Sequence, residues 1–147
     1  MTLTIYQRRL PHWRLKGSTY FVTWRIHPKQ KILTPEERTL VQSTILHFDK
    51  KRYELFAYVV MDDHVHVLFS PLEDFRVEEI VHSWKSYSVN KLQQNQFRKG
   101  RVWLDEYFDR IIRNESDLIE KANYILNNPQ KRWSGIENYS WVWTMGQ

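Results

Sequence analysis

The sequence has 147 residues, which corresponds to one domain over residues 1–147 with enough chain to bury a substantial core. It contains no cysteine, which excludes disulfides, thiolate metal sites and cysteine nucleophiles. No apolar run approaches the roughly 20 residues of a membrane span, and the N-terminus lacks the apolar core of a secretion signal, so we expect a cytoplasmic protein with no membrane partner.

The charge balance is basic, with 22 Lys and Arg against 17 Asp and Glu, a net charge of +5 and 15% aromatic residues. This composition suits nucleic acid, because phosphates bind cations and unstacked bases bind aromatic rings. Residues 1–17 are polar and basic. We expect them to form a loose arm or a segment that leads into a strand and contacts phosphates.

The first half of the chain predicts two strands with a helix between them. Residues 18–26 are rich in β-branched and aromatic side chains and predict a strand. Thr34, Pro35 and Glu37 are typical of a helix start, with an N-cap, a proline at the first helical position and a capping box. The strand-forming residues 53–61 follow.

A histidine pair marks the next strand, which follows an Asp62-Asp63 turn and is closed by Ser70 and Pro71. His64 and His66 alternate with valines, so they share one face, roughly 6.5 to 7 Å apart along the strand. Two imidazoles in this arrangement can bind one metal ion, although neutral histidine is also an ordinary half-buried sheet residue. A divalent ion would need a third protein group from elsewhere in the chain.

The second half predicts a helix, a strand and a helix. Apolar residues recur at helical spacing over residues 76–94, and residues 102–112 predict a strand with irregular alternation. Asn114 is the expected cap of the last helix, and Pro129 is its expected end because proline removes a backbone donor. The tail after this helix carries no clear pattern.

The order strand, helix, strand, strand, helix, strand, helix predicts an α+β fold of the ferredoxin-like, split βαβ type. We expect four antiparallel strands with the crossover helices on one face. The other face of the sheet would then be open to a ligand, with both histidines on it.

The last helix supplies candidates for the rest of the site. Tyr124 and Asn128 are one turn apart on one polar face. If this face meets the histidine strand, the Asn128 side-chain oxygen can complete the metal site, and Tyr124 can attack a phosphate to form a phosphotyrosine. Alternatively, Tyr124 is an ordinary helix aromatic and Asn128 a C-terminal cap. Tyr107 is a rival nucleophile without a ligand at one turn's spacing.

Four basic residues are candidate phosphate contacts, namely Lys85, Arg110, Arg113 and Arg132. Each could equally be a solvated charge that contributes little.

The chain resembles the REP-associated tyrosine transposases, which are single-domain HUH tyrosine transposases. The matching motifs are Tyr20-Phe21-Val22-Thr23-Trp24, Tyr58-Val59-Val60-Met61 with His64-Val65-His66, Val102-Trp103, Arg110-Ile111-Ile112-Arg113, and Tyr124-Ile125-Leu126-Asn127-Asn128-Pro129. The resemblance implies an HUH endonuclease fold and a divalent-metal-dependent enzyme, with Mg²⁺ or Mn²⁺, that nicks and rejoins single-stranded or hairpin DNA through a 5′-phosphotyrosine. It implies Tyr124 as the nucleophile and His64, His66 and Asn128 as the metal ligands.

Two positions depart from this family. Leu104 stands where a glutamine is common, and Asp62-Asp63 stands where proline or asparagine is frequent. These two acidic residues could tune metal affinity or simply form the turn. The alternative function is a domesticated nucleic-acid-binding protein that keeps the fold without transposition activity. The sequence leaves open which hairpin is recognised and whether the protein is a monomer or a dimer.

Overall fold

The computed structural model describes residues 17–146. Its elements in chain order are β1 (Tyr20–Ile26), α1 (Pro35–His47), β2 (Tyr53–Val60), β3 (His64–Pro71), α2 (Val77–Gln96), β4 (Trp103–Ile111), α3 (Glu115–Arg132) and β5 (Val142–Thr144). The basic N-terminal residues 1–16 lie outside the described part. The assignment of residues 1–147 to one domain therefore stays a prediction.

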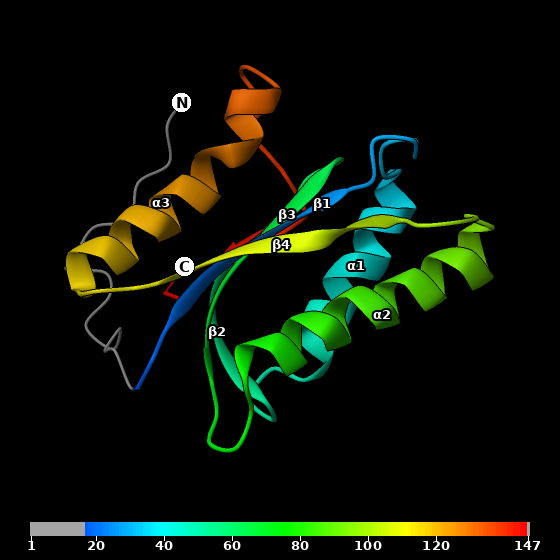
Figure 1. The fold of residues 1–147 in the computed structure, drawn as a ribbon. Coiled ribbons are helices and arrows are strands. Elements are labelled where there is room, and N and C mark those ends of the chain that lie inside the picture. Colours follow the sequence, from blue (N-terminus) through cyan, green and yellow to red (C-terminus); the bar gives the residue numbers. More distant parts are fainter. Residues whose placement is uncertain (1–16, 147) are drawn as a thin grey trace.

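The five strands form one antiparallel sheet in the order β4-β1-β3-β2-β5. Helices α1 and α2 lie together on one face, and α3 lies on the other (Figure 1). The predicted α+β, ferredoxin-like class is confirmed, with both crossover helices behind the sheet. The expected strand number of four is wrong, because β5 adds a strand at the edge of β2.

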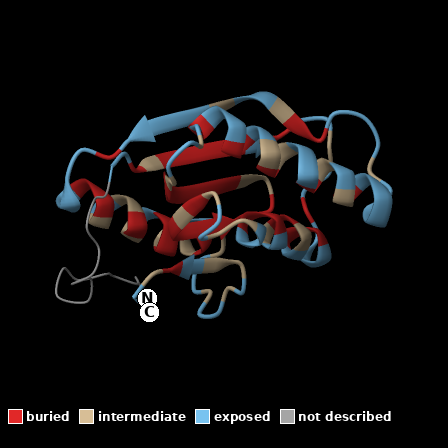
Figure 2. Cartoon of the chain, turned by 90° about the horizontal axis from the view of Figure 1, so that it is seen from below, coloured by how far each residue is buried: buried red, intermediate tan, exposed pale blue. Residues whose placement is uncertain are grey.

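The sheet separates two apolar clusters. Val65 and Val67 of β3 pack with Ile45 of α1 and Trp84 of α2, whereas Leu68 packs toward α3. Buried residues therefore concentrate in the central strands and the inward sides of the helices (Figure 2). This two-sided burial follows from the period-2 alternation of strand side chains.

The ends of α1 and α3 show why these segments are helical. The Thr34 hydroxyl accepts from the Glu37 backbone N–H at 3.2 Å, and the Glu37 carboxylate accepts from the Thr34 N–H at 3.0 Å, as the capping box predicts. The Asn114 side chain accepts from the Asp117 N–H at 2.9 Å and begins α3. Each cap satisfies backbone donors that have no partner within the helix.

The predicted end of α3 at Pro129 is wrong. The helix continues to Arg132 with Pro129 buried inside it, and the Trp133 backbone N–H donates to the Pro129 carbonyl at 2.8 Å. Proline removes one hydrogen bond but leaves its own carbonyl free to accept, so the following turn can still form. The extra turn carries Lys131 and Arg132 beside the histidine strand.

The short strand β5 escaped prediction because three residues are too few to show alternation. Its register is fixed by pairing with β2, where Tyr58 opposes Trp143, and the two rings stack with centroids 6.1 Å apart.

Among the described residues, no helix has the length and apolar character needed to cross a membrane.

Candidate metal and nucleophile site

The two histidines of β3 stand on the sheet face that α3 partly covers. Their ring centroids are 4.7 Å apart. Strand pairing places Arg25 opposite His64 and Thr23 opposite His66, so these four side chains occupy adjacent positions on β1 and β3. The expected convergence of both imidazoles on one face is observed.

His64 is held between a carboxylate and an amide. Its Nδ1 lies 2.7 Å from the Asp63 carboxylate, and its Nε2 lies 2.9 Å from the Asn128 side-chain oxygen. With Nδ1–H donating to Asp63, the Nε2 lone pair faces another acceptor oxygen. In this tautomer the His64 Nε2 and the Asn128 oxygen are adjacent, so both could be ligands of one metal ion. A carboxylate behind a histidine is also the usual way to orient a metal-binding imidazole.

His66 has a similar arrangement with a hydroxyl in place of the carboxylate. Its Nδ1 lies 2.6 Å from the Thr23 hydroxyl, and its ring is only 4% exposed. Its Nε2 is buried without a hydrogen-bond partner among the described residues. A buried polar atom without a partner is costly, so this nitrogen is suited to a ligand.

The electrostatics of the pair agree with this geometry. Burial, reinforced by the charges of His64, Arg25 and Lys131, lowers the pKa of His66 to about 3, which keeps the imidazole neutral and its lone pair available. Burial alone would raise the pKa of Asp63, but the hydrogen bond and charge of His64, together with Arg132, hold it below the usual carboxyl value. Asp63 is therefore a permanent negative charge behind His64.

The donor set fits a divalent ion. The described residues contain no group of three or more His, Cys, Asp or Glu side chains arranged for a metal. The His64 Nε2 and the Asn128 oxygen are adjacent, and the His66 ring lies 4.7 Å from the His64 ring between centroids. Water or substrate would fill the remaining positions of an ion bound here, as Mg²⁺ and Mn²⁺ sites commonly allow. His64, His66 and Asn128 could thus hold the predicted metal.

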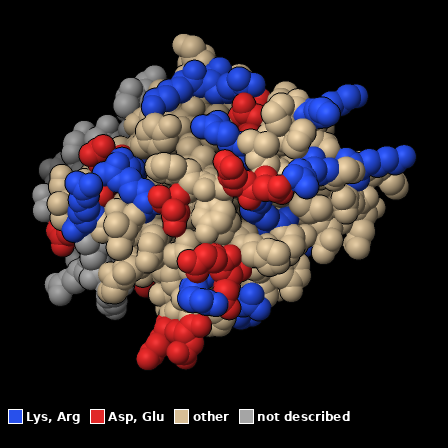
Figure 3. Space-filling model, viewed as in Figure 1, with Lys and Arg blue, Asp and Glu red and all other residues tan. Residues whose placement is uncertain are grey.

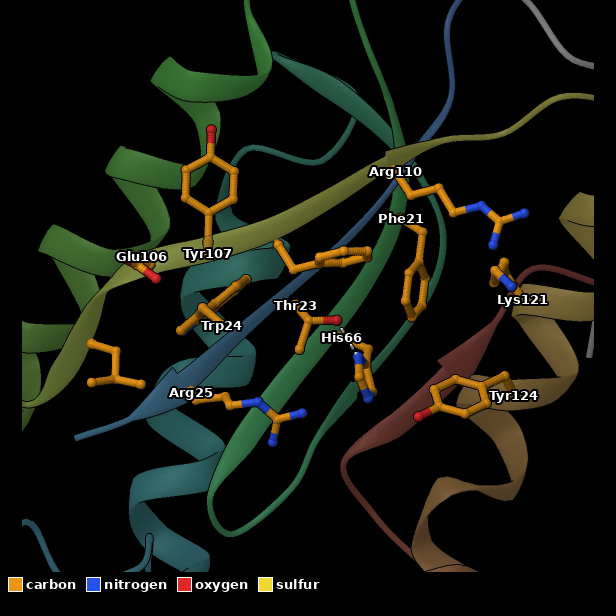
Figure 4. A pocket seen from close by; sticks show the side chains of 12 residues that line it. Phe21, Thr23, Trp24, Arg25, His66, Glu106, Tyr107, Arg110, Lys121 and Tyr124 are labelled. Atoms are coloured by element: carbon orange, nitrogen blue, oxygen red, sulfur yellow. Dashed lines mark hydrogen bonds between the residues drawn. The ribbon is translucent and has the colours of Figure 1, made fainter. Parts of the chain in front are cut away.

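Tyr124 lies beside this donor set. Its ring is 5.3 Å from the His66 ring and 6.0 Å from the Phe21 ring, measured between centroids, and the Lys131 ammonium lies 4.1 Å from its centroid. The side chain is exposed, so its hydroxyl is open to a substrate. In Figure 4 this hydroxyl points toward His66 and Arg25.

A cleft of about 570 Å³ adjoins Tyr124 and extends over β1 and β4. Its wall includes His66 and, from β4, Tyr107 and Arg110. Tyr107 points away from Tyr124 and His66 in Figure 4, and its ring packs against the core on the α1 and α2 face. Burial and the nearby Asp109 and Glu78 raise the pKa of Tyr107, which disfavours its phenolate. The structure thus separates the two candidate nucleophiles.

The four predicted phosphate contacts lie in different places. Arg110 lines the cleft and pairs with Asp117 at 3.3 Å. Arg132 pairs with Asp62 at 2.9 Å, one turn beyond Asn128. Arg113 is exposed at the junction of β4 and α3. Lys85 does not line the cleft, and its ammonium donates to the Leu104 and Asp105 carbonyls at 2.6 and 2.9 Å.

Sequence reasoning missed three basic residues near Tyr124. Arg25 lies two residues beyond Thr23 on the same strand face, and Lys121 and Lys131 lie on the Tyr124 face of α3. Strand alternation could have placed Arg25 beside the histidines, and helical spacing could have placed the two lysines beside Tyr124. The two turn residues also separate in role: Asp63 holds His64, whereas Asp62 pairs with Arg132.

Comparisons with known proteins identify the family to which the chain is similar. Residues 15–128 match the family model described as "Transposase IS200 like". A REP-associated tyrosine transposase of Escherichia coli (strain K12) is 23% identical over 118 residues, which cover 80% of this chain and 69% of that protein. A Haemophilus influenzae protein named "Putative REP-associated tyrosine transposase" is 28% identical over 130 residues, covering 79% and 72% respectively.

A solved structure of a REP-associated tyrosine transposase bound to a REP hairpin has a similar fold. The TM-score is 0.70 at 21% identity, over 95% of this chain and 82% of that one. At this level of identity the similarity demonstrates a shared fold.

Proposed function

The chain belongs to the IS200-like transposase family, and from this premise we propose that it nicks and rejoins single-stranded, hairpin-containing DNA through a 5′-phosphotyrosine on Tyr124. One observation carries the proposal. The paired His64 and Asn128, together with His66 and its unpartnered Nε2, lie beside an exposed tyrosine. A metal ion held next to a tyrosine can polarise a phosphodiester for attack by the phenol oxygen.

The chain's own residues account for the nicking step. The Tyr124 oxygen attacks the scissile phosphorus and the P–O3′ bond breaks, while the phenol gives its proton to water and the departing 3′ oxygen takes one up from water. A divalent ion on His64, His66 and Asn128 would polarise the phosphate and stabilise the charge that builds on it. Arg25 and Lys131 lie close enough to His66 to lower its pKa and add positive charge for the phosphate. Because one phosphoester replaces another, the reverse attack by a 3′ hydroxyl rejoins the strand.

The substrate preference is supported by the named relatives and by the charge distribution. REP-associated transposases are the named relatives, and one structural neighbour carries a REP hairpin, so hairpin DNA is the substrate we propose. Basic and acidic side chains are interspersed over the face shown in Figure 3. Phosphate binding is therefore expected to depend on a few placed cations rather than on one continuous basic surface.

A covalent-adduct experiment tests the proposal. End-labelled hairpin oligonucleotides with randomised single-stranded flanks are incubated with the protein and Mg²⁺ or Mn²⁺, then resolved on a denaturing gel. We expect an adduct with the unmodified protein, none with Tyr124→Phe, and an undiminished adduct with Tyr107→Phe. The reverse result for the two variants would refute the nucleophile. DNA binding without any adduct would favour the domesticated binder.

A further inference from the structure

Phe108 of β4 stands in one row with the histidine site. It pairs with Thr23 of β1, which in turn pairs with His66 of β3. Directly opposed residues of antiparallel strands project from the same face, and neighbouring strands are about 4.8 Å apart. Phe108 is therefore roughly 10 Å from His66, two strands across the open face.

Phe108 is 61% exposed, and its ring has no aromatic partner among the described residues. Aromatic residues on the opposite face behave differently, since Trp24 stacks on Trp84 with centroids 5.7 Å apart. A single exposed aromatic needs no explanation by itself. Phe108, however, lines the same cleft as Tyr124, so both side chains face the space that a bound DNA strand would occupy.

Cations lie on two sides of this cleft. Arg25 projects from β1 on one side, and Arg110 and Lys121 lie near each other on the other, with Thr23 and His66 between them (Figure 4). Arg25 makes no hydrogen bond or ion pair within the part of the chain that the structure describes. An apolar platform between cations matches a nucleotide, in which an aromatic base adjoins charged phosphates.

We propose that Phe108 is the stacking platform for an unpaired base next to the scissile phosphate, with Arg25 and Arg110 holding the flanking phosphates. This inference rests on the proposed function, because it names the nucleotide seat of the same site. A nucleotide matches both features at once, because its aromatic base suits the ring and its phosphates suit the cations on either side. Stacking tolerates any base, so Phe108 would supply affinity and hold the strand against Tyr124 without reading sequence.

Photocrosslinking tests where the base lies. The probe is a 12-residue oligodeoxythymidine containing 5-iododeoxyuridine, which crosslinks efficiently to a stacked aromatic ring under long-wavelength ultraviolet light. Peptide mapping should place the crosslink on Phe108. Phe97, which is 80% exposed outside the cleft, is the internal control and should remain unmodified. A crosslink on Phe97, or at another site with Phe108 unmodified, would overturn the proposal.

An affinity comparison tests the energetic role. Oligodeoxythymidine of 12 residues and an abasic 12-mer with the same phosphates are titrated in chelator, so that no cleavage occurs. Phe108→Ala should weaken binding of the thymidine oligomer about tenfold and leave the abasic oligomer unchanged. Phe108→Trp should retain affinity, and Phe97→Ala should alter neither. Equal weakening for both oligomers, or for neither, contradicts stacking.

The two proposals can fail separately. If a Tyr124 adduct forms on hairpin DNA but Phe108→Ala leaves thymidine binding unchanged, the base seat is refuted and nicking stands. If no adduct forms on any hairpin but Phe108 still crosslinks to the oligomer, the nicking function is refuted and the base seat stands as part of a binding protein.

Discussion

The two faces of the sheet are built for different purposes from the same strands. On the α1 and α2 face, the Trp84 indole donates to the buried Tyr53 hydroxyl at 2.9 Å, and burial raises the pKa of Tyr53 to about 12. On the α3 face, Tyr124 is exposed and the His66 Nε2 has no described partner. One tyrosine is locked as a neutral core group, and the other is open to a substrate.

Strand β3 shows how one segment serves both faces. Val65 and Val67 pack into the core behind the sheet, while His64 and His66 project from its front. The core therefore fixes the backbone that carries the two imidazoles. Each imidazole keeps a nitrogen lone pair that a ligand can use. If this division holds, changes behind the sheet should alter folding, and changes in front of it should alter metal and DNA binding.

The largest expected effect is on the core face. Trp84→Ala removes a fully buried ring that contacts Trp24, Tyr53 and Phe69. We expect the free energy of unfolding to fall by about 3–5 kcal/mol, measured by urea denaturation. The folded fraction should keep its metal affinity. A selective loss of metal binding with little loss of stability would contradict the division between the faces.

The complementary change on the front face replaces both histidines. His64→Ala with His66→Ala should weaken Mn²⁺ binding at least about 100-fold, or about 2.7 kcal/mol, in isothermal titration calorimetry. Asn128→Ala should lose less, because water can occupy an oxygen-ligand position. The free energy of unfolding of the metal-free double variant should fall by about 1–2 kcal/mol, less than for Trp84→Ala, because the buried Thr23 hydroxyl loses its partner. Unchanged Mn²⁺ affinity would refute the metal site.

A smaller loss of metal affinity is expected from changing Asp63, which contacts the proposed ligand His64. Asp63→Asn keeps the shape of the side chain but removes the charge that orients the His64 imidazole. Metal affinity should fall about 10- to 100-fold. Asp105→Asn is the matched control, because its carboxylate pairs with Arg101 in an exposed ion pair on the surface. Equal effects of both variants would show that Asp63 acts only through net charge.

The sequence predicted the elements with strong local signals. The capping box of Thr34 and Glu37, the alternation around His64, and the helical spacing of Tyr124 and Asn128 are all local patterns, and the structure contains each of them. Such patterns arise from short-range hydrogen bonding and side-chain periodicity, so they are readable without the fold.

Features that depend on distant partners could not be predicted in this way. The row from Phe108 through Thr23 to His66 exists only because β4, β1 and β3 pair in that register. Strand β5 is likewise defined by its pairing with β2. The charge of Lys85 is visible in the sequence, whereas its hydrogen bonds to the β4 carbonyls are not.

The smallest expected effect is on DNA binding, and it is tested with one cation from each face of the sheet, Arg25 and Lys85. Arg25→Ala on the front face should weaken binding of single-stranded DNA a few-fold and lower the slope of log affinity against log salt by about one, because one phosphate contact is lost. Lys85→Ala removes two hydrogen bonds to β4 and should cost about 1 kcal/mol of stability while leaving the salt slope unchanged. Fluorescence anisotropy at several salt concentrations, with urea denaturation in parallel, measures both quantities. If Lys85→Ala lowers the salt slope and Arg25→Ala does not, DNA binds on the helix side of the sheet, and the open face loses its assigned role.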